Sequence, residues 1–377
     1  MIVIIGNGIA SERVLSELFK KERGDVTLIK GEPYGPYPRP RLPEYVKGSV
    51  SRSFFTEDKL AKYTQRGLSV IESRATSIDV RNKSVTLSDK REISYDALII
   101  ATGSRARKLS LPTDGLVPHT LRTLSDADEI IATCENKRNP VVVGAGLLGL
   151  ELASAIKEKC GYRVSVIESA QYLLPRQLDE RSSLFFEKLL KKKGIDIIKG
   201  SAPKAYGKDS VLLEDGRDIS CDALFESVGV IPDIEIAKNT GIATERAIII
   251  DSHAMTSVKD VYAVGDAASY SGLCPGLVYF ALETARVAAI NADGGAEELK
   301  LMTPSAVIEV SGIPAYSIGD IRTYSDVKIH ENGNRYEALY LDGENRLVGS
   351  VAVGSRANML KAQKMLKKEV DLSLLDF

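Results

Sequence analysis

An internal repeat of two glycine-rich segments limits the folds that this sequence can adopt. The first segment, IVIIGNGIAS, contains Gly6 and Gly8, and the second, VVVGAGLLGLELA, contains Gly144 and Gly146. Each follows a short apolar run and precedes a pattern typical of a helix. A strand, a glycine-rich turn and a helix in this order are typical of dinucleotide-binding domains.

A second repeat supports the same interpretation. The segment ISYDAL, residues 93–98, is echoed by ISCDAL, residues 219–224, and the apolar run that follows each one leads to a glycine, Gly103 or Gly229. Two motifs repeated in the same order predict two copies of one domain type.

Short alternating runs lie between the two ends of each copy. They cover residues 68–71 and 84–87 in the first copy, and residues 195–198 and 210–213 in the second. Alternation bounded by turn residues is typical of strands, so we predict a small antiparallel meander in each copy.

After Gly229 the chain takes a different course. It contains DVYAVGDAA at residues 260–268 and then a helical pattern, LVYFALETARVAAINA, which ends before Gly294 and Gly295. We predict that this piece returns to complete the first domain. Residues from about 300 onward alternate in short strand patterns, and a lysine-rich helix is predicted from about Arg356.

The predicted fold class is α/β, with two Rossmann-type, three-layer dinucleotide-binding domains and a small C-terminal α+β domain. We place the first domain at residues 1–107 and 230–298, the second at 108–229 and the third at 299–377.

Composition argues against several functions. The chain has 377 residues with 50 basic and 51 acidic side chains, so its net charge of −1 favours neither nucleic acid nor an anionic membrane. Its apolar runs are far shorter than the roughly 20 residues that span a bilayer. The opening MIVIIG has none of the features of a secretory leader, so we expect a cytoplasmic location.

No metal site is predicted. The three histidines stand alone, and the four cysteines form no C-x-x-C pair. We interpret each cysteine as a small buried or half-buried residue: Cys134, Cys160, Cys221 and Cys274.

The first fingerprint is formed by Gly6, Gly8 and Ser11. In such a motif the first residue makes the tight turn, the second lets the backbone approach a pyrophosphate, and the third must be small. The phosphates are expected at the positive N-terminus of the helix that follows. Because Lys30 stands at the end of the second strand, Glu32 is the candidate for binding the ribose, and an exposed turn residue is the alternative.

The second fingerprint is completed by Gly149, and Glu168 ends its second strand, VSVIE. A carboxylate at this point accepts hydrogen bonds from both ribose hydroxyls and repels a 2′-phosphate. No arginine follows before Arg176. We therefore expect NADH rather than NADPH.

Two further motifs resemble those of a known family. Y-D-x-L-x-x-A-T-G at residues 95–103 and V-Y-A-V-G-D at residues 261–266 are similar to motifs of the FAD-dependent pyridine nucleotide-disulfide oxidoreductases, and the resemblance covers nearly the whole chain. It implies that the first domain binds FAD and that Asp266 bonds its ribityl chain. It also implies flavin contacts from Ala101, Thr102, Gly103, Arg105 and Gly265.

The resemblance assigns roles outside these motifs. P-Y-x-R-P-x-L at residues 36–42 is similar to a flavin-side loop, which implies a contact from Arg39, and Ala75 matches a position near the adenine. Glu151 matches a position beside the nicotinamide ring, and the alternative is an acid stabilised by the N-terminus of its helix. Gly229 is expected to let the dinucleotide pass close to the backbone.

The chain resembles a cysteine-less branch of this family. Members that use a protein thiol carry one or two cysteines after the second strand, whereas residues 31–48 contain none. The resemblance is greatest to the NADH:rubredoxin oxidoreductases. Many ferredoxin reductases have Ser-Lys where this chain has Pro43-Glu44, so we consider Arg41 and Lys47 as alternatives for balancing charge on the reduced flavin.

The resemblance implies an oxidoreductase that takes a hydride from NADH onto FAD and passes electrons to a small carrier protein such as rubredoxin. An NADH oxidase that makes peroxide and a redox-sensing flavoprotein scaffold are the alternatives. The oligomeric state is left open. The terminal helix is a candidate docking surface for an acidic carrier, or else a solvated face, with Arg356, Lys361, Lys364, Lys367 and Lys368.

Overall fold

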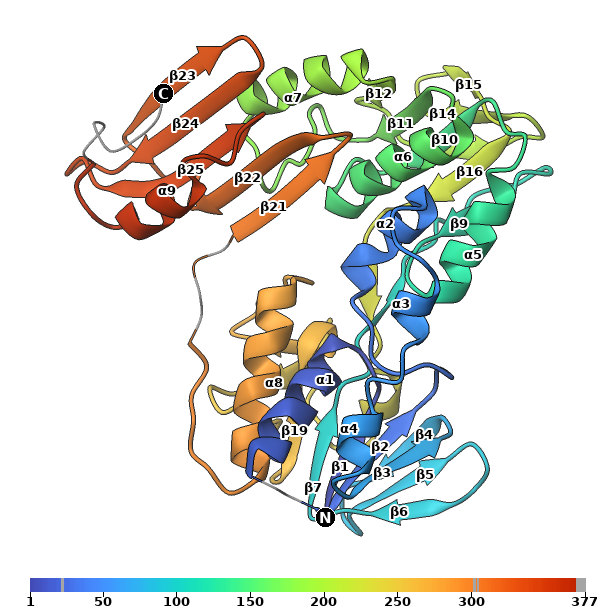
Figure 1. The fold of residues 1–377 in the computed structure, drawn as a ribbon, viewed down its shortest axis with the longest axis vertical. Coiled ribbons are helices and arrows are strands. Elements are labelled where there is room, and N and C mark those ends of the chain that lie inside the picture. Colours follow the sequence, from blue (N-terminus) through green and yellow to red (C-terminus); the bar gives the residue numbers. More distant parts are fainter. Residues whose placement is uncertain (22–23, 301–302, 304, 371–377) are drawn as a thin grey trace. The chain divides into compact units, whose positions relative to one another are not determined.

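A computed structural model of the chain describes residues 1–21, 24–300, 303 and 305–370. Its residues divide into two units (Figure 1). Unit 1 is built from Met1–Arg39, Ser51–Arg105 and the segment that begins at Val230 and runs to about residue 300. Unit 2 is built from Pro40–Val50, Ala106–Gly229 and the chain from residue 303 onward.

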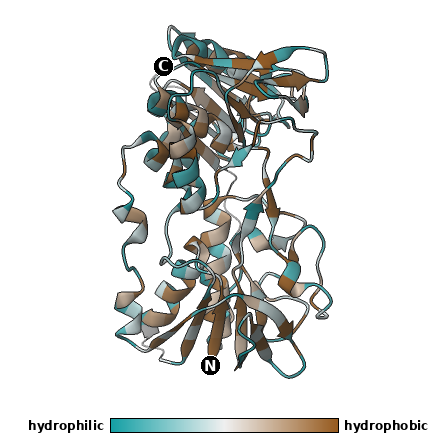
Figure 2. Cartoon of the chain, turned by 90° about the vertical axis from the view of Figure 1, so that its right-hand side faces the viewer, coloured by the Kyte–Doolittle hydropathy of each residue, from teal (hydrophilic) through white to brown (hydrophobic). Residues whose placement is uncertain are grey.

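Unit 1 contains a five-stranded parallel sheet of order β19-β7-β1-β2-β3. Four of its strands, β1, β2, β7 and β19, are buried along their whole length, which explains their largely apolar sequences. Figure 2 shows how apolar residues gather in these strands. The strands are β1 (Ile2–Ile5), β2 (Val26–Lys30), β3 (Leu68–Glu72), β7 (Ala97–Ile100) and β19 (Val261–Ala263).

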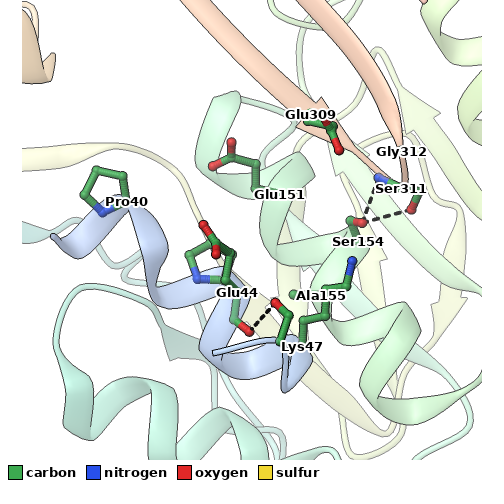
Figure 3. Close-up of a pocket in the computed structure, with 11 residues that line it drawn as sticks. Pro40, Glu44, Lys47, Glu151, Ser154, Ala155, Glu309, Ser311 and Gly312 are labelled. Atoms are coloured by element: carbon green, nitrogen blue, oxygen red, sulfur yellow. Dashed lines mark hydrogen bonds between the residues drawn. The ribbon is translucent and has the colours of Figure 1, made fainter. Parts of the chain in front are cut away.

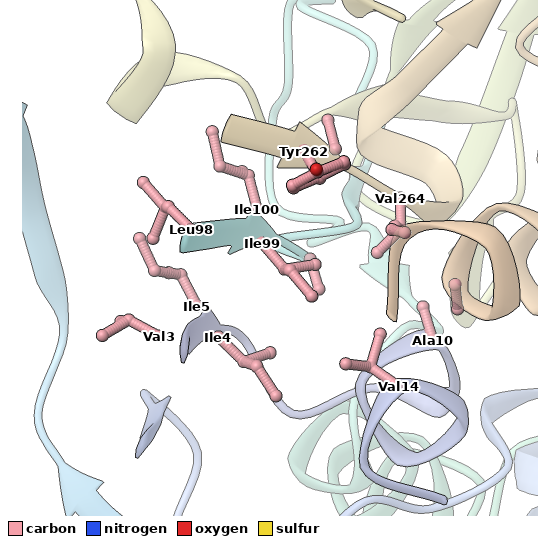
Figure 4. Packing of buried hydrophobic residues seen from close by; sticks show 14 of the residues in the cluster. Val3, Ile4, Ile5, Ala10, Val14, Leu98, Ile99, Ile100, Tyr262 and Val264 are labelled. Carbon is pink, nitrogen blue, oxygen red and sulfur yellow. The ribbon is translucent and has the colours of Figure 1, made fainter. Parts of the chain in front are cut away.

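Two helices of unit 1, α1 (Ile9–Leu18) and α8 (Val278–Ala292), pack against each other, and α8 also contacts β7 and β19. Figure 4 shows side chains of β1 and β7 packed with Ala10 and Val14 of α1. Because β19 pairs with β7, the segment after Gly229 does return to the first sheet, as predicted.

The predicted meanders need one correction. Residues 68–71 and 195–198 do not lie in meanders. They form β3 and β12, which are edge strands of the two large sheets and pair in parallel with β2 and β11, respectively. Both strands are partly exposed, so their sequences mix apolar and polar residues as those of meander strands do. The meanders are β4 (Ala75–Asp79), β5 (Ser84–Leu87) and β6 (Glu92–Ser94) in unit 1, and β13 (Pro203–Tyr206), β14 (Ser210–Leu213) and β15 (Asp218–Ser220) in unit 2.

Unit 2 repeats the parallel sheet, with the order β12-β11-β10-β16-β9. Pro140 lies opposite Ala223 here, as Ile2 lies opposite Ala97 in unit 1, so the two sequence echoes occupy the same place in both sheets. The elements are β9 (His119–Thr120), β10 (Pro140–Val143), β11 (Val164–Glu168), β12 (Ile195–Lys199), β16 (Ala223–Glu226), α5 (Leu124–Thr133) and α6 (Leu147–Cys160).

The C-terminal part of unit 2 is a five-stranded antiparallel sheet of order β21-β22-β25-β24-β23. Helix α7 (Glu180–Lys192) contacts β24 and β25, and the Tyr340 hydroxyl donates a hydrogen bond of 2.6 Å to Asp179, the N-cap of α7. The strands are β21 (Ser305–Val310), β22 (Ile313–Gly319), β23 (Asp326–Asn332), β24 (Arg335–Leu341) and β25 (Leu347–Val353).

The terminal helix is shorter than predicted. Helix α9 (Met359–Met365) begins after Arg356 and ends before Lys367, whose φ of +64° leaves the helical region. The Lys367 N–H donates to the Leu347 carbonyl, and the Leu347 N–H donates to the Lys368 carbonyl. The role of this segment in docking stays a prediction, and residues 371–377 lie outside the described part of the chain.

The remaining short elements are β8 (Ser104–Ala106), β17 (Val230–Pro232), β18 (Ile248–Ile250), β20 (Ala268–Tyr270), α2 (Leu42–Lys47), α3 (Ser53–Thr56) and α4 (Ala61–Thr64). Two parallel sheets with helices and a C-terminal antiparallel sheet confirm the predicted α/β fold class. Within the described residues, no helix has the length and apolar character needed to cross a bilayer. The cytoplasmic location stays a prediction.

Candidate dinucleotide-binding sites

The first fingerprint forms the turn between β1 and α1. Gly6 has a φ of +106°, and a Cβ atom there would lie 2.3 Å from the Ala101 backbone oxygen, so only glycine fits. Ser11 is fully buried, and its hydroxyl donates to the Gly6 carbonyl at 2.6 Å. Serine is accommodated at the third position because it makes this hydrogen bond within the turn.

The middle glycines of the two fingerprints occupy equivalent places. Gly8 and Gly146 are the N-caps of α1 and α6, and neither helix has a side-chain cap. A Cβ atom at either position would have no neighbour within 4 Å. Open space in front of backbone N–H groups that have no partner within their helix suits an anionic group such as a pyrophosphate.

The A-T-G and G-D motifs meet in unit 1. The Thr102 hydroxyl donates to the Asp233 carbonyl at 2.5 Å, and Gly103 has a φ of +72°. Next along the chain, the Ser104 hydroxyl donates to the Asp266 carboxylate at 2.7 Å. The residue that follows the A-T-G motif is therefore joined to Asp266 of the G-D motif by a hydrogen bond.

Gly265 lies between the two helices of unit 1. It has a φ of +67°, its N–H donates to the Thr284 hydroxyl of α8 at 3.0 Å, and a Cβ atom there would lie 3.4 Å from the Ala10 Cβ atom of α1. This packing fixes the position of Asp266, the next residue. Of the other predicted flavin contacts, Ala75 is half-buried at the start of β4, and Arg105 is exposed on β8.

Glu32 and Arg39, which were predicted separately, form one cluster. They make an ion pair, and Tyr37 lies between them: its hydroxyl donates to Glu32 at 2.7 Å and accepts from Arg39 at 3.2 Å. Lys30, at the end of β2, donates to the Pro33 carbonyl at 2.7 Å. The structure thus supports Glu32 as a held carboxylate and not merely an exposed turn residue.

The second fingerprint is packed more tightly than the first. Gly144 has a φ of +103°, and a Cβ atom there would lie 2.3 Å from the Ser227 backbone oxygen. A Cβ atom on Gly149 would lie 2.0 Å from the Gly144 oxygen. The third glycine therefore allows α6 to approach the turn, as its position in the motif predicts.

Glu168 is fixed at the same turn. Its carboxylate accepts hydrogen bonds from the N–H groups of Ala145, at 2.8 Å, and Ala170, at 2.9 Å. Ala145 stands between the first two glycines of the fingerprint, so the carboxylate is held at the fingerprint turn. Gly229, with a φ of +96°, has open space where a side chain would begin.

Glu151 lines a cavity of about 390 Å³ in unit 2 (Figure 3). Its pKa is raised to about 7, chiefly by burial and also by the negative charge of Glu44, while the positive charge of Arg356 partly opposes the rise. Three segments line the cavity. They are α6, with Glu151, Ser154 and Ala155; α2 and its flanks, with Pro40, Pro43, Glu44, Lys47 and Ser49; and the end of β21 with the turn that follows it, with Glu309, Ser311 and Gly312.

With this geometry established, comparison with known proteins decides the family. A family model described as pyridine nucleotide-disulphide oxidoreductase matches residues 1–292. The chain belongs to the pyridine nucleotide-disulphide oxidoreductase family. This confirms the resemblance drawn from the A-T-G and G-D motifs.

Relatives within the family are similar along nearly the whole chain. The NADH-rubredoxin oxidoreductase of Clostridium acetobutylicum is 35% identical over 99% of this chain and 94% of its own length. The crystal structure of that enzyme matches with a TM-score of 0.82 and 33% identity, over 98% of this chain and 96% of the other. A ferredoxin reductase from Rhodopseudomonas palustris matches with a TM-score of 0.88 and 28% identity, over 99% of this chain and 98% of the other.

Sequence reasoning missed a buried acid at the end of β16. Glu226, the last residue of β16, is 1% exposed and accepts hydrogen bonds from the Tyr206 hydroxyl, at 2.5 Å, and the Leu109 N–H, at 3.2 Å. Burial and this carboxylate raise the pKa of Tyr206. The available signal was a charged residue that ends an otherwise apolar strand.

The cysteines are free, and their predicted burial is confirmed: Cys134 and Cys221 are buried, and Cys160 and Cys274 are half-buried. Their thiols also make contacts that the sequence did not indicate, and one of them is a 3.4 Å hydrogen bond from the Cys221 thiol to the Ala223 carbonyl. The Cys160 thiol donates to the Cys134 carbonyl at 3.5 Å, and the Cys274 thiol donates to the Asp266 carbonyl at 3.5 Å. In the described part of the chain, no group of three or more His, Cys, Asp or Glu side chains is arranged to hold a metal ion.

Proposed function

We propose that the protein is an FAD-dependent oxidoreductase that takes a hydride from NADH and passes electrons to a small carrier protein such as rubredoxin. The observation that carries this proposal is the presence of two dinucleotide-type sites in one chain, with no cysteine in residues 31–48. The names of the similar proteins, an NADH-rubredoxin oxidoreductase and a ferredoxin reductase, support a carrier as the acceptor.

We assign FAD to residues 1–107 and 230–298. FAD, when bound, supplies an acceptor for a hydride that can release its two electrons one at a time. The open helix N-terminus at Gly8 suits its pyrophosphate, and the Glu32 carboxylate suits its ribose hydroxyls. Asp266, held by Ser104, would accept hydrogen bonds from the ribityl chain.

We assign NADH to residues 108–229. Gly146 leaves room for the pyrophosphate at the N-terminus of α6. Glu168 would accept hydrogen bonds from the ribose hydroxyls and repel the additional phosphate of NADPH. Glu151, one turn into α6, would lie beside the nicotinamide ring.

A turnover assay tests the proposal. The yellow holoenzyme is mixed with NADH or NADPH, and the reduction of a rubredoxin, of a ferredoxin and of oxygen is followed separately. We expect NADH to be preferred and a carrier to be reduced faster than oxygen. Faster oxygen consumption would favour the oxidase, and slow turnover with every acceptor would favour the redox-sensing scaffold.

A further inference from the structure

Glu151 differs from every other charged residue that lines its cavity. Glu44 is paired with Arg41 at 2.6 Å, Lys47 with Glu158 at 3.0 Å, and Glu309 with Arg356 at 3.4 Å. No hydrogen bond or ion pair holds the Glu151 carboxylate among the residues that the structure describes. Its charge is therefore the one that the cavity leaves without a fixed counterpart.

The two glutamates that α2 and α6 contribute to the cavity, Glu44 and Glu151, have pKa values shifted in opposite directions. The hydrogen bonds from Arg41 lower the pKa of Glu44, so Glu44 stays ionised at neutral pH. Burial and the negative charge of Glu44 raise the pKa of Glu151 to about 7, so a proton stays on Glu151 up to about that pH. Two carboxyl groups whose environments separate their pKa values in this way divide the roles of anion and acid between them.

The other charged groups around the cavity do not remove this asymmetry. From α2, Lys47 is directed to Glu158 of α6. From β21, Glu309 adds a third carboxylate, and its partner Arg356 follows β25 and partly offsets the negative charge. The balance at Glu151 thus depends on burial, Glu44 and Arg356.

We propose that Glu44 sets the charge that Glu151 presents to the nicotinamide ring. Burial and the charge of Glu44 together keep Glu151 protonated while the ring is uncharged, as in NADH, and Glu151 becomes ionised when the ring carries a positive charge, as in NAD+. This inference rests on the proposed function, which places the ring beside Glu151. Glu44 is here a positioning residue that acts through Glu151.

The proton step is balanced without a further reactant. The O–H bond of Glu151 breaks, its proton passes to water, and no electrons leave the carboxyl group. The hydride itself goes to the flavin, as the proposed function already requires. A carboxylate beside a cationic ring stabilises it, whereas a protonated carboxyl does not favour the cation before the hydride has left.

The first experiment examines the carboxyl pair without any nicotinamide. Infrared difference spectra of the holoenzyme, wild type against Glu151→Gln, follow the protonated carboxyl band of Glu151 as pH is raised. We expect the band to disappear near pH 7, and in Glu44→Gln at a lower pH, because one of the two causes that raise the pKa of Glu151 is removed. Glu129→Gln removes an exposed carboxylate from α5 of the same unit and should leave the transition unchanged. Bound FAD absorbance confirms that each variant is folded.

The second experiment examines the ring. NAD+ and tetrahydro-NAD, whose ring is uncharged and cannot donate a hydride, are titrated into the oxidised holoenzyme between about pH 6 and about pH 8. We expect the affinity for NAD+ to rise several-fold across this range and the affinity for tetrahydro-NAD to stay constant. Glu44→Gln should move the rise to lower pH, and Glu151→Gln should abolish it.

The two experiments separate the possible failures. An infrared transition that Glu44→Gln does not move overturns the role of Glu44 and leaves the proposed function standing. The inference is also overturned if the infrared transition occurs as expected but the affinity for NAD+ does not change with pH, because the ring then does not lie beside Glu151. If the wild-type enzyme does not oxidise NADH, the proposed function itself is overturned.

Discussion

Folding changes the pKa of single residues in unit 2. Glu151 is the clearest case because its pKa rises from 4.5 to about 7 on folding, chiefly through burial. Between these two values the folded protein holds a proton that the unfolded chain has lost. Stability therefore falls as pH rises through this window and stays constant above it.

Glu151→Gln should remove this dependence. The variant should gain little free energy of unfolding near pH 4.5 and progressively more up to about pH 7, to a gain on the order of 3 kcal/mol that then remains constant. Urea unfolding of both proteins at about pH 5 and about pH 8 measures the difference. An equal gain at the two pH values would show that the carboxyl group does not titrate as the structure indicates.

Asp266 carries the corresponding prediction for unit 1. Asp266→Ala should weaken FAD retention, because charge-assisted hydrogen bonds of about 1.5–3 kcal/mol are lost. Ser104→Ala is the matched control, since it removes only the hydroxyl that donates to Asp266 and keeps the carboxylate. Flavin absorbance after gel filtration reports the content. Full retention in Asp266→Ala would contradict the assignment of this motif to FAD.

At the scale of secondary-structure elements, each fingerprint joins a strand to a helix, and its positions differ in whether they can accept a side chain. Gly149 has the Gly144 oxygen directly in the path of a side chain, whereas Gly146 has open space there. The contrast separates a residue needed for packing α6 from a residue needed for a ligand.

Gly149→Ala should therefore lower the free energy of unfolding by about 1–3 kcal/mol, because the added methyl group pushes α6 away from the turn. Gly146→Ala should cost less than about 1 kcal/mol at this N-cap position but weaken NAD+ binding. Thermal unfolding and NAD+ titration of both variants provide the test. Equal losses of stability would mean that the turn relaxes around either methyl group.

Secondary-structure elements could be predicted where the sequence of a single strand indicates how deeply that strand is buried. Continuous apolar runs such as residues 2–5 and 140–143 gave buried parallel strands. Residues 68–71 and 195–198 were assigned wrongly because partial exposure produces the same alternation in an edge strand and in a meander. The length of α9 depends on the backbone of Lys367, which pairs with Leu347, and no local pattern indicates such a contact.

At the scale of the whole molecule, the candidate sites could be predicted in part. The fingerprint glycines and Glu168 follow from motif spacing, and Asp266 follows from the resemblance of its motif to the family. The cavity around Glu151 does not, because it needs Glu44 and Glu309, which are far apart in the sequence and meet only in the folded unit. The assignment of residues 40–50 to unit 2, inside a stretch that otherwise builds unit 1, has the same cause.

The return of the chain to β19 and α8 affects how the protein folds while it is being synthesised. β7 is synthesised early, but its neighbour β19 and the helix that covers α1 follow only after residue 260. The entire parallel sheet of unit 2 is made during that interval, which lasts on the order of ten seconds at translation rates of about 5–20 residues per second. The second sheet can thus be complete while the first still has an open edge at β7 and an uncovered apolar face on α1. The N-terminal residues, which are synthesised first, are therefore prone to aggregation for the longest time.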